Sequence, residues 1–160
     1  MCAGSAHLIM KMDKPDFSGR WRFNPQRSTL QITAPDSTEI LIDHREPEFR
    51  LSRTHTIGGR KDVFSLALTT DGREVTVRQD DLDVRAHAFW EGDHLVFSSS
   101  VSRGGSTGTN VVIYSLGASP DTLIAEESFR SSALNYDNTW VLDRVGPLAE
   151  DSPVTRPTDS

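Results

Sequence analysis

Three polar side chains occur on strand faces that are otherwise apolar. Arg53 and His55 continue an apolar alternation that starts at Phe49. Glu127 continues another alternation, which starts at Leu123. Successive side chains of a β-strand point to opposite faces, so each of the three is expected to point the same way as its apolar neighbours. Because burying an unpaired charge costs several kcal/mol, we expect Glu127 to contact Arg53, His55 or water.

These side chains are suited to two kinds of chemistry. In a binding site, Arg53, His55 and Glu127 would orient the polar end of a ligand. In an enzyme, Glu127 and His55 would form an acid–base pair, since a desolvated carboxyl group near a histidine can titrate near neutral pH, and Arg53 would stabilise developing negative charge. A structural role is equally open, as an internal ion pair or as strand ends that reach water. His44 and Tyr114 are further candidates for ligand binding.

The segment that organises the chain is predicted to be a strand over residues 17–24. Its odd-numbered positions hold Phe, Gly, Trp and Phe, and its even-numbered positions hold Ser, Arg, Arg and Asn. This alternation is typical of a strand with one face in a core and the other in water. Pro15 and Pro25 bound the segment, because proline cannot continue a ladder.

The remainder of the chain repeats this pattern between turn signals such as Gly58-Gly59 and Asp71-Gly72, the second of which predicts a two-residue turn. No amphipathic helix of three turns is apparent. About ten short strands separated by turns predict an all-β fold, a single up-and-down antiparallel barrel of about 8–10 strands. The predicted strands are 17–24, 38–44, 49–57, 62–70, 75–77, 82–90, 94–102, 109–116, 122–130 and 136–145.

In two of these strands the alternation of apolar and polar residues is less regular. Residues 109–116 include Val111, Val112, Ile113 and Tyr114 in succession, so their facing is ambiguous. The serines at 98–100 and 102 are expected on a polar outer face.

The composition indicates one globular domain, with 160 residues of which 36% are hydrophobic and 25% charged. We predict an N-terminal tail over 1–14, which is either mobile or a short helix that plugs the fold. The barrel domain is predicted over 15–146, and a disordered C-terminal tail over 147–160. The net charge of −6 argues against a nucleic-acid partner. Cys2 is the only cysteine, which excludes an internal disulfide.

The sequence carries no motif of a familiar catalytic or targeting type. The absence of a signal peptide and of a long apolar stretch predicts a cytoplasmic protein without a membrane partner. No P-loop, Gly-x-Ser-x-Gly or His-Glu-x-x-His motif occurs, and the five histidines lack the spacing of metal ligands. We therefore expect neither a metal nor a cofactor, and the oligomeric state is left open.

Several motifs resemble those of the lipocalin and calycin superfamily. Gly19-Arg20-Trp21 is similar to its G-x-W signature on the first strand. The W-E-G-D-H-L-V run at 90–96 resembles a hairpin in a family of bacterial lipocalin-like proteins of unknown function. The resemblance covers about residues 16–145 and implies an antiparallel barrel that a tryptophan closes at one end. It also implies that a basic residue of the last strand packs over this tryptophan, and Arg144 occupies that position.

Two features depart from the fatty-acid-binding proteins, which are also calycins. Their Arg-x-Tyr clamp for a carboxylate would fall on Trp140 and Leu142, and their two-helix lid is replaced by residues 25–37, which contain two prolines. A conventional fatty-acid carrier is therefore not expected. We predict that the barrel binds a small hydrophobic or amphipathic molecule. The alternatives are a cofactor-independent cyclase or isomerase in the same cavity, by fold-level analogy, and a solid barrel that acts in protein association.

Overall fold

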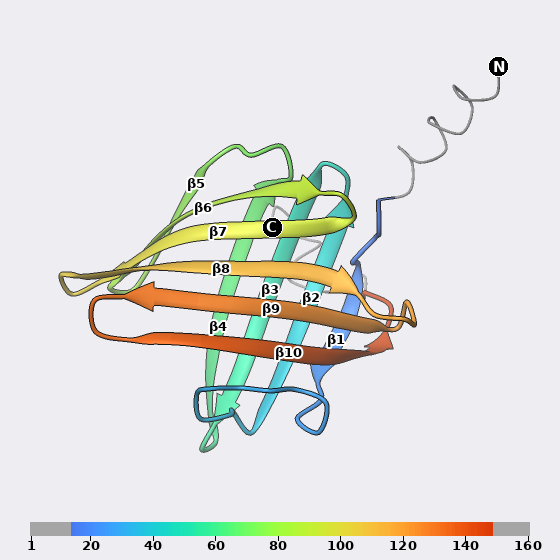
Figure 1. Ribbon diagram of the computed structural model, residues 1–160, viewed down its shortest axis with the longest axis horizontal. Coiled ribbons are helices and arrows are strands. Elements are labelled where there is room, and N and C mark those ends of the chain that lie inside the picture. Colours follow the sequence, from blue (N-terminus) through green and yellow to red (C-terminus); the bar gives the residue numbers. More distant parts are fainter. Residues whose placement is uncertain (1–13, 149–160) are drawn as a thin grey trace, which may run out of the picture.

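The computed structural model describes residues 14–148, and these residues form ten β-strands and no helix (Figure 1). The all-β prediction is therefore confirmed. The strands are β1 (Gly19–Phe23), β2 (Ser37–Arg45), β3 (Glu48–Ile57), β4 (Arg60–Thr69), β5 (Val75–Gln79), β6 (Leu82–Glu91), β7 (His94–Arg103), β8 (Ser106–Leu116), β9 (Thr122–Ser131) and β10 (Asn135–Gly146). The two predicted tails lie outside the described residues, apart from residues 14, 147 and 148.

The strands form one antiparallel sheet in the order β4-β3-β2-β1-β10-β9-β8-β7-β6-β5. β1 pairs with both β2 and β10, so the first and last strands are joined. β4 and β5 are the remaining edges, and the sheet curls into a nearly closed barrel. In Figure 1, β7–β10 pass across β2–β4, which shows the two walls. The prediction of an up-and-down barrel is confirmed.

The two-residue turn predicted at Asp71-Gly72 is wrong, because among the described strands β4 and β5 do not pair. Asp71 forms an isolated bridge with Phe89 of β6, and the backbone N–H of Gly72 donates to Ala88 O at 2.8 Å. These backbone groups find their partners on β6. The chain therefore passes here from one edge of the sheet to the other.

The tryptophan of β1 is fully buried, and its indole Nε1 donates to Phe17 O at 2.9 Å. The guanidinium carbon of Arg144 lies 4.3 Å from the Trp21 ring centroid, which confirms the packing that the resemblance implies. Arg144 Nη1 also donates to Ser18 O at 2.6 Å. A side chain at Gly19, where φ is 144°, would collide with this guanidinium group. Glycine is therefore required next to the Arg144–Trp21 pair.

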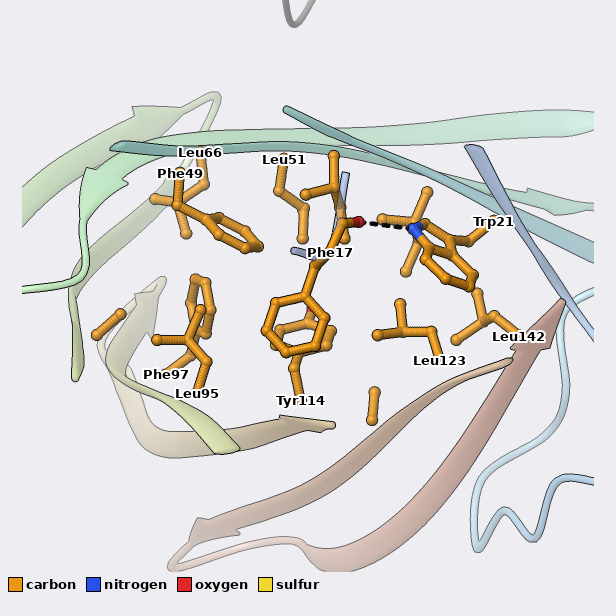
Figure 2. Close-up of a cluster of buried hydrophobic side chains, with 14 of the residues drawn as sticks. Phe17, Trp21, Phe49, Leu51, Leu66, Leu95, Phe97, Tyr114, Leu123 and Leu142 are labelled. Carbon is orange, nitrogen blue, oxygen red and sulfur yellow. Dashed lines mark hydrogen bonds between the residues drawn. The ribbon is translucent and has the colours of Figure 1, made fainter. Parts of the chain in front are cut away.

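The apolar faces of the strands pack together inside the barrel (Figure 2). Figure 2 shows Phe17 at the centre of the cluster, with Trp21 and Leu142 on one side and Phe49 and Phe97 on the other. Full burial of one such side chain contributes roughly 1.5–3 kcal/mol. This cluster is therefore a main source of the stability of the barrel.

Aromatic rings gather where β2 ends and β3 begins. The Phe17 ring stacks on His44, with 5.7 Å between centroids, and on Trp90, with 6.1 Å. The His44 ring lies 5.2 Å from that of Phe49. We call these four residues, together with Trp21, the aromatic end of the barrel.

The connection from β1 to β2 runs along β10. Thr29 forms an isolated bridge with Thr139, and partly buried Leu30 and Ile32 pack against the core. This connection contains no helix, in contrast to the two-helix lid of the fatty-acid-binding proteins. Residues 14–148 include no helix with the length and apolar character needed to cross a membrane.

Candidate ligand-binding cavity

The interior of the barrel contains a cavity of about 260 Å³ that is partly open to solvent, so the barrel is not packed solid. A second cavity of about 80 Å³ shares part of its lining. Five residues line both cavities: Arg53, Asn110, Val112, Tyr114 and Glu127. The remaining walls of the larger cavity are mainly apolar. They comprise Leu51, Phe64, Leu66, Leu82, Val84, Ala86, Phe97, Ser99, Val101, Phe129 and Tyr136.

Arg53 enters this space from β3. Its guanidinium carbon lies 5.5 Å from the Phe64 ring centroid, and its Nη2 lies 3.8 Å from Asp62 Oδ2. The Nε–H is buried and has no hydrogen-bond partner among the described residues. Arg53 therefore lines the cavity and also carries one buried donor that the described residues leave unpaired.

His55 lines the smaller cavity, where its ring stacks on Trp140 at 5.6 Å between centroids. Its Nδ1 lies 2.7 Å from the hydroxyl oxygen of buried Thr38. Burial, and to a lesser extent the charge of Arg53, lower the pKa of His55 from 6.5 to about 4. The imidazole is therefore neutral at pH 7 and adds no charge to the site.

Glu127 enters from β9 and is held by two donors. Its Oε1 accepts from Asn138 Nδ2 and from Trp140 Nε1, both at 2.9 Å. Among the described residues, no ion pair joins Glu127 to Arg53 and no hydrogen bond joins it to His55. The acid–base pair of the enzyme hypothesis is thus not directly bonded. The partners that hold Glu127 are neighbours on β10.

Tyr114 is buried and lines both cavities, and burial raises the pKa of its hydroxyl. His44 lies elsewhere, at the aromatic end, and does not line either cavity. Its Nδ1 accepts from the backbone N–H of Phe17 at 3.2 Å, and its Nε2 donates to Glu46 Oε1 at 2.8 Å. The structure thus brings together four of the five predicted site residues and places His44 apart from them.

Asn110 and Ser99 line the larger cavity and were not among the predicted site residues. They face each other across the β7–β8 ladder, so the outward facing predicted for Ser99 is wrong. Asn110 Oδ1 is buried without a partner among the described residues. Asn110 has the same parity as Tyr114, and that spacing is the sequence signal that could have identified it.

The site can bind a polar group, since Arg53 supplies a donor, Glu127 an acceptor, and Asn110 and Tyr114 can each do both. Within residues 14–148, no group of three or more His, Cys, Asp or Glu side chains is arranged to hold a metal ion. The arrangement is therefore one of hydrogen-bonding groups within an apolar cavity.

The chain matches no protein-family model, and no curated protein sequence matches it. Among solved structures, it is similar to secretory abundant heat soluble protein 4 from Ramazzottius varieornatus, with a TM-score of 0.57 and 14% identity, over 82% of this chain and 96% of that one. A second secretory abundant heat soluble protein of that organism gives a TM-score of 0.58 and 10% identity, over 79% and 93%.

The zebrafish ileal bile acid-binding protein, solved with cholic acid, is also similar, with a TM-score of 0.53 and 11% identity over 81% of this chain and 98% of that one. At these identities the likeness concerns the fold alone. Together with the ten-stranded topology and the Arg144–Trp21 contact, it confirms the predicted fold. The chain has the barrel fold of the lipocalin/calycin type.

Proposed function

We propose that this chain binds one small amphipathic molecule inside its barrel. The observation that carries the proposal is the cavity of about 260 Å³, whose walls are apolar except at one polar group of residues. The apolar part of the ligand would lie against β4, β6 and β7. Its polar end would contact Arg53, Asn110, Tyr114 and Glu127.

The volume of the cavity limits the size of this ligand. An apolar cavity of about 150 Å³ is large enough for benzene, and sites for drug-sized ligands usually measure about 300–1,000 Å³. The present cavity lies between these values. A short alkyl chain or a small ring system with one polar group fits this range.

The comparison with solved structures gives limited support. One structural neighbour is described as a bile acid-binding protein and was solved with cholic acid. A protein of similar fold thus binds a bile acid. The chemical class of the ligand of this chain has to be inferred from the residues that line its own cavity.

A neutral fluorescent probe tests the proposal. N-phenylnaphthylamine fluoresces more strongly in an apolar environment and carries no charge, so it reports on the cavity and not on the charged surface. We expect saturable binding to the wild type. Ala86→Phe should weaken it at least about tenfold, because Ala86 is buried and lines the cavity that the new ring would fill.

Ala67→Phe is the matched control, because Ala67 is on the exposed face of β4. This variant should bind the probe as the wild type does. Absence of saturable binding, or equal binding by the two variants, would contradict an internal site.

A further inference from the structure

Two polar atoms of the cavity lack hydrogen-bond partners in the described part of the chain. They are Arg53 Nε, a donor, and Asn110 Oδ1, an acceptor. Leaving a buried polar group unpaired costs about 1–3 kcal/mol, so such atoms are rare in folded proteins. Both residues line both cavities. Both atoms are fully buried, so a ligand would pair with them after the Arg53 and Asn110 side chains turn toward the space that they line.

The charges around the cavity select among possible ligands. Within residues 14–148, the lining of the two cavities contains one arginine, Arg53, and one carboxylic acid, Glu127, which are of opposite charge type. A second carboxylate, that of Asp62, lies 3.8 Å from Arg53 Nη2. An anionic group in the cavity would thus meet a guanidinium that is already opposed by Asp62. It would also share a confined space of low polarity with Glu127, where like charges repel strongly.

We propose that the polar end of the ligand is an uncharged group that both accepts and donates hydrogen bonds, of the carboxamide type. Its carbonyl oxygen accepts from Arg53 Nε, and its N–H donates to Asn110 Oδ1 and to the carboxylate of Glu127. This inference rests on the proposed function, since it names the class of molecule that the same cavity takes. It differs from carboxylate binding, for which the chain lacks the Arg-x-Tyr pair.

Three probes with the same alkyl chain separate charge from hydrogen bonding. Octanamide is neutral and both donates and accepts, methyl octanoate is neutral and only accepts, and octanoate is anionic at pH 7. Their affinities are measured by displacement of N-phenylnaphthylamine from the wild type. We expect octanamide to bind at least about tenfold more tightly than octanoate, and more tightly than the ester by a smaller factor of about 3–10.

Two pairs of variants assign these differences to residues. Asn110→Leu should weaken octanamide binding about 3–10-fold and change ester binding much less, because the ester has no N–H to lose a partner. Its control is Thr109→Val, on the exposed face of the same strand. Glu127→Gln should strengthen octanoate binding, because the repelling charge is removed. Its control is Glu126→Gln, at an exposed position beside it.

The outcomes distinguish the inference from the proposed function. Octanoate binding as tightly as octanamide, or octanoate binding that Glu127→Gln does not strengthen, would overturn the carboxamide inference. Displacement of the dye by none of the three probes would also overturn it. In each of these cases the internal site itself stands if Ala86→Phe weakens dye binding and Ala67→Phe does not. Both ideas fail together if the dye does not bind.

Discussion

The aromatic end and the cavity occupy the same barrel and both contain polar groups on inward faces. At the aromatic end these groups are paired within the protein: the Trp21 indole donates to Phe17 O, and both ring nitrogens of His44 have partners. In the cavity, Arg53 Nε and Asn110 Oδ1 have none among the described residues. An inward polar residue thus serves the fold where the protein completes its hydrogen bonds, and is available to a ligand where it does not.

The carboxylate of Glu46 is an example of a polar group whose hydrogen bonds are completed by the protein next to the aromatic end. Its carboxylate accepts from Thr70 Oγ1 at 2.6 Å, and from His44 Nε2 and Trp90 Nε1 at 2.8 Å each. Burial acts to raise the pKa of Glu46, but the hydrogen bonds from these three residues outweigh it and lower the pKa. The carboxylate therefore links His44 of β2, Thr70 directly after β4, and Trp90 of β6 at this end of the barrel.

The largest expected effect is loss of stability on truncation at the aromatic end. Trp21→Ala removes a fully buried ring and should lower the free energy of unfolding by about 3–5 kcal/mol. Phe129→Ala, in the cavity wall, should cost less than half as much, because that ring is only partly buried and already borders empty space. Urea denaturation measures both values, and equal costs would remove the energetic distinction between the two regions.

The second effect is a pH dependence that arises in the cavity. Burial and Arg53 lower the pKa of His55 to about 4, although Asp62 and Glu127 act in the opposite direction. The unfolded chain, with an ordinary value near 6.5, then binds the proton more readily, so stability falls as the pH drops from about 6.5 to 4.

Because His55 is only partly buried, solvent screens part of this effect, and the loss attributable to it should be on the order of 1–2 kcal/mol over this window. His55→Gln should remove that part of the slope, whereas His87→Gln, on the outward side of β6, should leave it unchanged. Measuring unfolding free energies at several pH values tests this. An unaltered slope in His55→Gln would mean that the imidazole is not desolvated.

The third effect concerns the residue that covers the aromatic end. Arg144→Met removes the contact with the Trp21 ring and the bond to Ser18 O, and should cost about 1–2 kcal/mol. Arg22→Met is the control, because Arg22 is 62% exposed and pairs with Glu39 only at 3.8 Å. Such an exposed pair contributes little. Equal melting temperatures of the two variants would indicate that Arg144 acts only as a surface charge.

Strand alternation was enough to predict the charged residues and the histidine of the cavity lining, but not its other polar residues. Arg53, His55 and Glu127 each interrupt a clear apolar face, and in a barrel that face points inward. Asn110 was missed because the residues after it are apolar on both faces, which hides the period of two. Once Tyr114 is seen to face inward, Asn110 is expected to face inward too, because the two positions differ by an even number.

Contacts between strands could not be predicted from the sequence. Glu127 is held by Asn138 and Trp140 because of the register of β9 with β10, and alternation within one strand carries no information on register. The turn predicted at Asp71-Gly72 failed for a related reason. The residues have the chemistry of a hairpin, but the local sequence does not show that the barrel seam lies between β4 and β5.

The last prediction tests the comparison most directly, since it pairs two inward asparagines. Asn138 is satisfied: its Oδ1 accepts from the backbone N–H of Gln31 at 2.8 Å, and its Nδ2 donates to Glu127. Asn138→Leu leaves the Gln31 N–H without its acceptor and removes one of the two donors to Glu127 Oε1, and it should cost about 1–2 kcal/mol. Asn110→Leu leaves no hydrogen-bond partner of its side chain unpaired among the described residues and removes a buried oxygen that has no donor, so it should leave stability unchanged or raise it by up to about 1–3 kcal/mol. Urea denaturation of both variants gives the two free energies of unfolding. A loss of stability in Asn110→Leu as large as that in Asn138→Leu would show that the protein itself uses the Asn110 amide. The cavity would then lack its free acceptor.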